Sequence, residues 1–369
     1  MYVKHLQCIF CGRKYNKNNV RFKCDCGESL DVVYNYNKIR KKLAWDILRK
    51  RFFGHWRYRE FFPITKDENI ITLGEGGTPL IGAGKIRGHR VFMKYEGMNP
   101  TGSFKDRGTT VEISKALELK TKIISCASTG NMGASISAYA SRAGMTAKVF
   151  VPSNIRKAKV RQIEYYGGHL IHTKGHYAHA INKAMEISKR KKYFLMGDYP
   201  YRGEGEKSIA YEVIDQMDGK VDYIICPIGS GTLFSGVWKG LKEMKIAGLI
   251  KYMPKLIGVQ AKGCSTVCKA FLKGENVIEN VVPKTKASAI ACGKPLDGYK
   301  ALFSLYESDG YCVDVSDNEM EAAKRELATY GVYAELSAAA PLAGFRKMHD
   351  SIKRNSNIVL IVTGNGLKE

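Results

Sequence analysis

The sequence predicts an α/β protein with two open, mainly parallel α/β domains and a small cysteine-rich appendage at its N-terminus. Three observations lead to this prediction. Short apolar segments alternate with helix-like segments along most of the chain. Glycine-rich turns follow several of the apolar segments, and four of the ten cysteines lie within the first 26 residues.

The composition is that of a large globular protein. The chain has 369 residues, of which 44% are hydrophobic and 25% charged, so it can bury a sizeable core and divide into at least two domains. No apolar run reaches membrane-spanning length, and residues 1–5 contain no signal-peptide core. We expect a cytoplasmic protein without membrane contact, in which the six scattered cysteines are reduced and buried.

The clustered cysteines form two close pairs, Cys8 with Cys11 and Cys24 with Cys26, and a glycine follows each pair. Four thiolates satisfy tetrahedral zinc, and glycine permits the tight turn that such a site needs. The second pair is Cys-x-Cys rather than Cys-x-x-Cys. A redox pair is the alternative, but it leaves the second pair unexplained. We predict a structural zinc site in a zinc-ribbon-like segment.

The net charge of +24 is the one unusual bulk property. A basic surface can bind nucleic acid, and a basic zinc-ribbon protein that binds nucleic acid is therefore an alternative from another functional class. The basic residues are dispersed, however, with only short runs such as 40–42 and 189–192, and no nucleic-acid-binding motif is present. We expect a solvated surface that attracts anionic substrates, and no nucleic-acid partner.

Beyond the cysteines, residues 35–62 are basic and aromatic, with apolar residues at helical spacing. The remaining chain alternates as βαβ units do. We expect strands at 91–93, 122–128, 147–151, 169–172, 222–227, 256–260, 311–315 and 357–362. We expect helices after residue 105, at 131–142, 156–166 and 177–189, from 233, and at 265–273, 299–308, 317–330 and 336–350.

Two loops between a predicted strand and a predicted helix are suited to anions. Residues 128–133 read Ser-Thr-Gly-Asn-Met-Gly, and residues 228–232 read Ile-Gly-Ser-Gly-Thr. Free N–H groups at a helix N-terminus bind carboxylates and phosphates, and ligands of open α/β sheets lie at the carboxyl ends of strands. Thr363 directly follows the last predicted strand, so its hydroxyl should lie at such an edge.

A lysine is embedded in the turn-forming phrase Asn-Pro-Thr-Gly-Ser-Phe-Lys-Asp-Arg-Gly at residues 99–108. This phrase resembles the cofactor-lysine motif of the fold-type II pyridoxal-phosphate (PLP) enzymes, the tryptophan synthase β superfamily, and is most similar to the threonine synthase family. The resemblance extends from Trp56 to the chain end, with motifs in the family's order. These motifs lie at residues 56–63, 74–80, 99–108, 128–133, 199–208, 228–232 and 363–368.

The resemblance implies a role for residues at the cofactor. Lys105 would form the Schiff base with PLP and act as the acid and base of the reaction, while Asn131 would face the PLP 3-hydroxyl oxygen. Thr363 would meet the pyridine nitrogen. The PLP phosphate would be bound by a loop whose members are Gly229, Ser230, Gly231 and Thr232.

The resemblance also implies substrate contacts. Ser128 and Thr129 would hold the substrate α-carboxylate. Arg202, together with Lys207 and Ser208, would grip a substrate phosphate, a task that suits the planar guanidinium. Many threonine synthases carry asparagine where this chain has a serine, in the loop at 229–232, and this departure weakens the substrate prediction but not the cofactor prediction.

The implied activity is conversion of O-phospho-L-homoserine and water to L-threonine and phosphate by a homodimer. Cysteate synthase, which would use O-phosphoserine and sulfite, is the nearest alternative, and threonine or serine dehydratase is a further one. We expect a zinc-ribbon-like segment at 1–34, a large PLP-binding domain from 35–110 and 196–369, and a small α/β domain at 111–195.

Overall fold

The computed structural model describes residues 2–128, 130–153, 157–174 and 177–369. The chain forms two compact units. Unit 1 comprises Met1–Ile39, Tyr58–Glu75 and Lys105–Gly205, and unit 2 comprises Arg40–Arg57, Gly76–Phe104 and Glu206–Glu369. The predicted three-part domain division stays a prediction.

Unit 1 contains a four-stranded parallel sheet with the strand order β8-β7-β6-β9. Its strands are β6 (Ile123–Ala127), β7 (Thr146–Pro152), β8 (His169–Thr173) and β9 (Phe194–Leu195). The helices are α3 (Lys105–Glu118), α4 (Asn131–Arg142), α5 (Lys157–Tyr165), α6 (Tyr177–Lys191) and α7 (Pro200–Glu206). Strands and helices alternate along this part of the chain, as predicted; the first residue predicted for the helix at 156–166 lies outside the described residues.

The cysteine-rich N-terminus forms a second sheet in unit 1, antiparallel and in the order β2-β1-β3. The strands are β1 (Val3–Cys8), β2 (Lys14–Tyr15) and β3 (Leu30–Tyr34). Phe22, between β2 and β3, packs edge-on against Phe194 and Tyr199 at 5.6 Å between ring centroids. The Tyr34 hydroxyl donates a hydrogen bond to Glu204 at 2.5 Å. The N-terminal sheet is therefore packed into unit 1.

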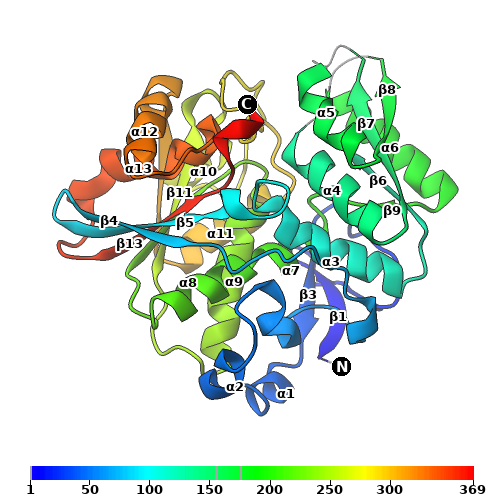
Figure 1. The fold of residues 1–369 in the computed structure, drawn as a ribbon, viewed down its shortest axis with the longest axis horizontal. Coiled ribbons are helices and arrows are strands. Elements are labelled where there is room, and N and C mark those ends of the chain that lie inside the picture. The colour runs from blue at the N-terminus through cyan, green and yellow to red at the C-terminus, as the bar shows by residue number, and fades with distance from the viewer. Residues whose placement is uncertain (1, 129, 154–156, 175–176) are drawn as a thin grey trace. The chain divides into compact units, whose positions relative to one another are not determined.

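Unit 2 is built on a six-stranded sheet in the order β12-β11-β10-β13-β5-β4 (Figure 1). Its strands are β4 (Leu80–Ile86), β5 (His89–Tyr95), β10 (Tyr223–Pro227), β11 (Lys255–Ala261), β12 (Tyr311–Val315) and β13 (Asn357–Val362). Only the edge strand β4 runs antiparallel to its neighbour. All of β10 is buried, which explains its continuous apolar sequence.

Unit 2 also contains helices, several of which pack against this sheet. The helices are α2 (Trp45–Arg49), α8 (Ser208–Gln216), α9 (Thr232–Ile246), α10 (Thr266–Lys273), α11 (Gly298–Glu307), α12 (Asp317–Thr329) and α13 (Ala340–Met348). α12 and α13 bury apolar side chains with alternate residues of the strands, such as Ile225, Val259 and Leu360, in one core cluster. A Ser316–Glu319 capping box begins α12.

The helical spacing of segment 35–62 corresponds to two short helices rather than to one long one. The segment forms the short helices α1 (Tyr36–Arg40) and α2, followed by a 3₁₀ segment at His55–Phe61. The chain is extended at Ala44, with φ −144° and ψ 162°, so the first helix cannot continue. Ile39 and Leu48 are still buried, and the apolar spacing reflects this burial.

Cys268 of α10 and Cys312 of β12 form a disulfide, with their Cα atoms 5.2 Å apart. The expectation that all scattered cysteines are reduced is therefore wrong for this pair. The two residues are 44 positions apart, and their proximity arises only when α10 packs beside β12. The bond closes a ring of chain that includes residues 289–297.

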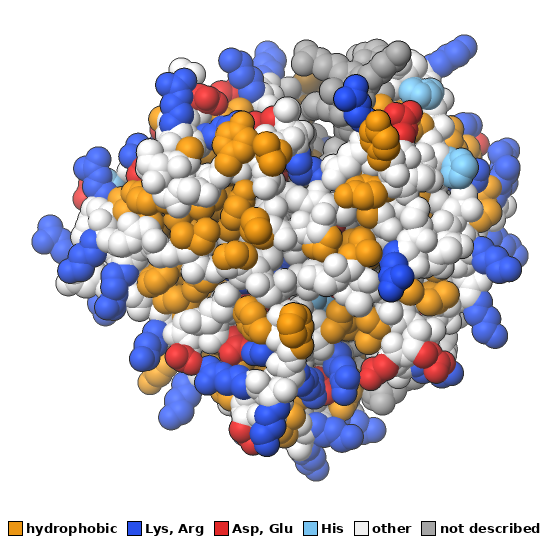
Figure 2. Space-filling view, viewed as in Figure 1, with side chains coloured by type: hydrophobic (Ala, Val, Ile, Leu, Met, Phe, Trp, Pro, Cys, Tyr) orange, Lys and Arg blue, Asp and Glu red, His pale blue; other side chains and the backbone are white. Residues whose placement is uncertain are grey.

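No helix in the described part of the chain is long and apolar enough to cross a membrane. Lysine and arginine side chains are spread over the face drawn in Figure 2 and do not gather in one patch. This distribution matches the dispersed basic residues of the sequence.

Candidate active site

The segment that carries Lys105 is hydrogen-bonded to the end of the chain. Phe104 N donates to Thr363 O at 3.0 Å, and Asn365 N donates to Gly102 O at 3.0 Å. Ser103 and Gly364 form an antiparallel bridge within the same pairing. Because β13 ends one residue before Thr363, this pairing fixes the residues just before Lys105 at the carboxyl edge of the unit 2 sheet.

Lys105 itself is the first residue of α3. Its carbonyl oxygen accepts hydrogen bonds from Thr109 Oγ1 at 2.9 Å and from the Arg202 guanidinium at 3.4 Å. Gly102 has φ +85°, in the left-handed region that favours glycine. The chain therefore turns sharply before the lysine, and the helix that follows begins from a fixed point.

The glycine-rich loop of unit 2 connects β10 to α9. Gly231 is the N-cap of α9 and has φ +98°. A Cβ atom at Gly231 would lie 2.5 Å from Asp297 O, so only glycine fits here without displacing backbone. Thr232 begins α9 and is 3% exposed. The loop lies at the carboxyl end of β10, which pairs directly with β13, so it shares a sheet edge with Thr363.

The predicted carboxylate loop of unit 1 connects β6 to α4. Ser128 Oγ accepts hydrogen bonds from Gly133 N at 2.9 Å and Gly130 N at 3.4 Å. Asn131 is the first residue of α4 and is partly buried. Thr129, also predicted to bind substrate, lies outside the described residues.

Arg202 of α7 is completely buried. Its guanidinium pairs with Glu112 of α3, and its Nε donates to Gly197 O at 3.2 Å. Gly197 N donates to Glu112 at 3.1 Å, while further guanidinium bonds reach Lys105 O and Thr109 Oγ1 at 3.4 Å. Arg202 therefore joins α7 to the helix that begins at Lys105, and its predicted contact with a substrate phosphate stays a prediction.

Lys207 and Ser208, the other predicted phosphate contacts, belong to unit 2 and are also fully buried. Lys207 Nζ lies 2.9 and 3.0 Å from the two carboxylate oxygens of Glu243. Ser208 Oγ lies 2.9 Å from Nδ1 of His55. Each of these polar groups has an internal partner, as buried charges and hydroxyls generally require.

The four N-terminal cysteines converge. Their sulfur atoms all lie within 4.8 Å of one another, with 3.6 Å between Cys8 and Cys26 and 3.5 Å between Cys11 and Cys24. Four thiolates at zinc–sulfur bonds of about 2.3 Å in a tetrahedron would be about 3.8 Å apart. The measured separations match that arrangement.

The backbone around the cysteines has the turns that a metal knuckle needs. Gly12 and Gly27, which follow the two pairs, have φ +71° and +91°, as the sequence prediction required. Burial opposes ionisation of Cys24, but hydrogen bonds with Tyr15 and Cys26 outweigh it and lower the pKa of this thiol to about 6. The thiolate is the form that binds metal.

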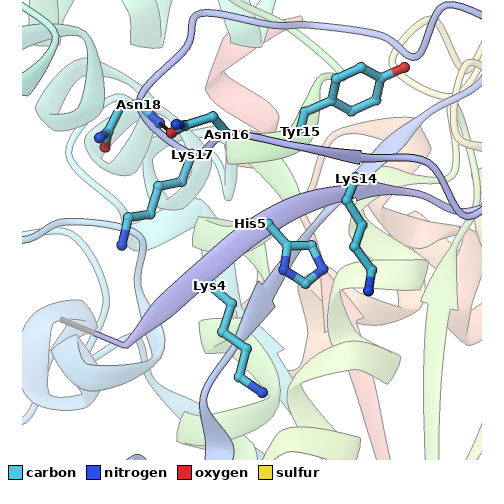
Figure 3. A pocket seen from close by; sticks show the side chains of 7 residues that line it. All are labelled: Lys4, His5, Lys14, Tyr15, Asn16, Lys17 and Asn18. Carbon is cyan, nitrogen blue, oxygen red and sulfur yellow. Dashed lines mark hydrogen bonds between the residues drawn. The ribbon is translucent and has the colours of Figure 1, made fainter.

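A hollow of about 460 Å³ lies on the same N-terminal sheet. Figure 3 shows its lining side chains along β1, β2 and the turn after β2, where Lys4, His5, Lys14 and Lys17 supply basic groups. Lys17 Nζ donates to Val3 O at 3.0 Å. The hollow contains none of the predicted site residues, and its lysines have the character of a solvated surface.

The pyridoxal-phosphate-dependent enzyme family model matches residues 71–364. The threonine synthase of Methanocaldococcus jannaschii is 38% identical, over 98% of this chain and 92% of that protein. The threonine synthase of Halalkalibacterium halodurans is 39% identical, over 86% of this chain and 91% of that protein. The chain belongs to the threonine synthase family of pyridoxal-phosphate-dependent enzymes.

Solved structures agree with the fold of this family. Maize serine racemase superimposes with a TM-score of 0.69 at 22% identity, over 78% of this chain and 88% of that one. Threonine deaminase isoform 2 from Solanum lycopersicum gives 0.69 at 23% identity, over 78% of each chain. The predicted fold-type II α/β class is confirmed.

The residues present fit the cofactor of the threonine synthase family. Ser103, two positions before Lys105, is completely buried, and its hydroxyl has no hydrogen-bond partner among the described residues. A buried polar group without a partner is costly unless a ligand supplies one. Gly231, with φ +98° at the N-cap of α9, is the kind of glycine-led helix start at which phosphates bind.

Sequence reasoning missed three residues at this site. Ser103 could have been found from its position within the lysine motif at residues 99–108. Glu112 lies in a helical sequence and Asp297 in a loop sequence, and neither belongs to a motif. Their importance arises from partners that are distant in sequence, Arg202 for Glu112 and Thr232 for Asp297.

Proposed function

We propose that this chain is a threonine synthase, which converts O-phospho-L-homoserine and water to L-threonine and phosphate. One observation carries the proposal. The lysine motif and the C-terminal Thr-Gly-Asn-Gly phrase, 258 positions apart at Lys105 and Thr363, are joined by the hydrogen bond from Phe104 N to Thr363 O. Their pairing supports a common role at the cofactor, and the names of the similar proteins support the reaction.

The proposed cofactor residues follow from the sequence prediction. Lys105 would bind PLP covalently, Asn131 would face its 3-hydroxyl oxygen, and Thr363 would meet its pyridine nitrogen. The cofactor phosphate would lie on residues 229–232, where the N–H groups at the start of α9 have no carbonyl partners within the helix. When bound, PLP stabilises negative charge at the α and β carbons of an amino acid.

The protein's own groups would then move protons and exclude competing reactions. The Lys105 amine would transfer protons at the α and β carbons of the substrate, and the γ carbon would take up a proton to become the methyl group of threonine. The neutral hydroxyl of Thr363 would leave the pyridine nitrogen unprotonated, which favours elimination of phosphate over transamination. Water would add at the β carbon after phosphate leaves the γ carbon. Ser128 would orient the substrate α-carboxylate.

An assay with two substrates tests this proposal. Purified holoenzyme is given O-phosphohomoserine alone, or O-phosphoserine with sulfite, and phosphate release and amino-acid products are measured. We expect threonine from the first mixture, and no absorption from lysine-bound cofactor in Lys105→Ala. Cysteate from the second mixture with the first inert would establish the alternative, cysteate synthase. A variant Lys105→Ala with normal turnover would contradict the cofactor assignment.

Arg202 needs a test that separates internal pairing from substrate contact. Arg202→Met alone strands the buried Glu112, which by itself costs about 3–5 kcal/mol of stability. The double variant Arg202→Met/Glu112→Met removes both charges and preserves packing. If Arg202 binds the substrate phosphate, as predicted, the double variant folds but its KM for O-phosphohomoserine rises at least ~10-fold. Normal KM in the folded double variant would assign Arg202 to structure alone.

We also propose that the cysteine cluster binds one structural zinc ion through Cys8, Cys11, Cys24 and Cys26. The sulfur separations and the left-handed glycines support this proposal. Metal analysis should find one zinc per chain, and chelation should destabilise the N-terminal sheet while the lysine-bound cofactor keeps its absorption. Zinc-free protein purified without chelator, with all four thiols reactive, would contradict it. A cytoplasmic location and a homodimer without a nucleic-acid partner stay predictions.

A further inference from the structure

The glycine-rich loop of unit 2 is held from behind by a segment that no motif marks. Asp297 N donates to Ser230 O at 2.9 Å, and Leu296 N donates to Ser230 Oγ at 3.2 Å. A Cβ atom at Gly229 would lie 3.3 Å from Ala289 O, so the segment packs closely along the loop. The shape of the loop therefore depends on residues about 60 positions further along the chain.

Asp297 has an unusual position within this segment. It is the N-cap of α11, where aspartate usually accepts a hydrogen bond from an amide of its own helix, but its side chain caps no amide of α11. Instead its carboxylate accepts a hydrogen bond from Thr232 Oγ1 at 2.8 Å, and Asp297 is 1% exposed. The Asp297 carboxylate therefore stabilises the glycine-rich loop rather than the N-terminus of α11.

A buried carboxylate behind a phosphate site creates an electrostatic conflict. Like charges that are separated by a few ångströms of protein repel more strongly than they do in water. Lys300, one turn along α11, places its ammonium 3.3 Å from Asp297 Oδ1, and its side chain is 16% exposed. The lysine thus pairs with one oxygen of the carboxylate, Oδ1, while Thr232 bonds the other, Oδ2.

We propose that Asp297 and Lys300 are positioning residues for the cofactor phosphate. Asp297 fixes the loop through Ser230 and Thr232, and Lys300 cancels the charge of Asp297, so that the layer behind the loop does not repel a phosphate dianion. This inference rests on the proposed placement of the cofactor phosphate at residues 229–232. It predicts that removing the charge of Lys300 weakens cofactor binding, whereas removing the charge of Asp297 does not.

The experiment measures PLP dissociation from diluted holoenzyme, by loss of the absorption of lysine-bound cofactor, at low and high salt. Lys300→Met keeps the aliphatic stem but removes the ammonium beside the Asp297 carboxylate. We expect about tenfold weaker PLP binding, with the deficit reduced at high salt because mobile ions screen the repulsion. A chemical-shift change of the cofactor phosphate in ³¹P NMR should accompany it.

The variant that removes the carboxylate charge should not weaken PLP binding. Asp297→Asn keeps an oxygen acceptor for Thr232, removes the negative charge behind the loop and retains the Lys300 ammonium, so PLP should bind at least as tightly as in the wild type. The double variant Asp297→Asn/Lys300→Met carries neither charge. Its PLP affinity should return to within about threefold of the wild type.

A control variant tests whether merely loosening the segment explains the result. Asp317 accepts hydrogen bonds from Thr285 Oγ1 and, at 3.0 Å, from Lys286 N, and so anchors the same stretch of chain upstream of residues 289–297. Asp317→Asn should leave the PLP affinity, its salt dependence and the ³¹P shift unchanged.

The outcomes separate this inference from the proposal on which it rests. Unchanged PLP affinity in Lys300→Met, no recovery in the double variant, or equal weakening by Asp297→Asn would each overturn the charge-balancing role. A Gly231→Ala variant that binds PLP as tightly as the wild type would instead overturn the placement of the phosphate on the loop. Cysteate as the product would overturn the proposed reaction and leave the PLP measurements standing.

Discussion

Two loops of this molecule have the same local plan and are stabilised in different ways. Residues 228–232 follow the buried strand β10 in unit 2, and residues 128–133 follow β6 in unit 1; each loop contains glycine and begins a helix. In unit 2, the loop is bonded to an outside segment through Ser230 and Thr232. In unit 1, Ser128 bonds the loop's own amides at Gly130 and Gly133.

The difference indicates which anion each loop suits. Where a serine hydroxyl already accepts from two amides at a helix start, fewer donors remain for a ligand. We expect such a loop to bind a carboxylate through few hydrogen bonds. We expect the loop that is fixed from behind, whose N-cap is a glycine, to bind the oxygens of a phosphate through the amides at the helix start. A strand–glycine–helix pattern alone does not distinguish these two cases.

The strongest way to break the comparison is to add a methyl group at each N-cap. Gly231→Ala forces a left-handed φ on alanine and brings Cβ within 2.5 Å of Asp297 O, which together should cost about 2–5 kcal/mol. PLP affinity should fall at least ~100-fold. In Gly130→Ala the added Cβ meets no atom within 4 Å, so PLP affinity should equal that of the wild type.

Urea unfolding and PLP titration of both variants check this prediction. If Gly130→Ala weakened PLP binding as much as Gly231→Ala, the two loops would not differ as described.

The next prediction concerns the stability of unit 2, which contains both cysteines of the disulfide. The bond between Cys268 and Cys312 closes a ring that includes the segment behind residues 228–232, and its loss should lower the unfolding free energy by about 2–4 kcal/mol. Native protein denatured without reductant should show eight free thiols per chain, and ten after reduction. Ten thiols before reduction, with an unchanged melting temperature on adding reductant, would show that the bond is absent.

The smallest predicted effect concerns the serine of the unit 1 loop. Ser128→Ala removes the acceptor for Gly133 N and should cost about 1 kcal/mol of stability. Loss of the proposed carboxylate contact in this variant should raise the KM for the amino-acid substrate several-fold, with kcat nearly unchanged. Ser137→Ala, in the same helix α4, removes only a bond to Gly133 O and serves as the matched control. Equal KM values in the two variants would remove Ser128 from the substrate site.

The sequence was informative where one local pattern decides the structure. The continuous apolar run at 222–227 predicts a strand buried on both faces, and the glycines after it predict the turn into α9; the structure has both elements. The spacing of four cysteines likewise predicts a cluster, and their sulfur atoms converge. In each case, the residues that determine the geometry are neighbours in the chain.

The sequence was uninformative where the partner is remote. Nothing near Arg202 indicates that Glu112, 90 residues earlier, will neutralise it. The same applies to Cys268 and Cys312, which meet only after α10 and β12 have packed. In segment 35–62, burial of Ile39 and Leu48 gives helical spacing on both sides of the break at Ala44, so the spacing does not mark where the first helix ends.

The covalent ring closed by Cys268 and Cys312 also changes how proteases would affect the molecule. Residues 274–282 run without helix or strand and are mostly exposed, and such segments are where chains are usually cut. A cut there opens the backbone inside the ring, so the two fragments stay covalently attached while the bond is intact. The nicked protein would migrate as one species without reductant and as two with it. Residues 289–297, behind the loop at 228–232, would then be held through the C-terminal fragment and its bond at Cys312.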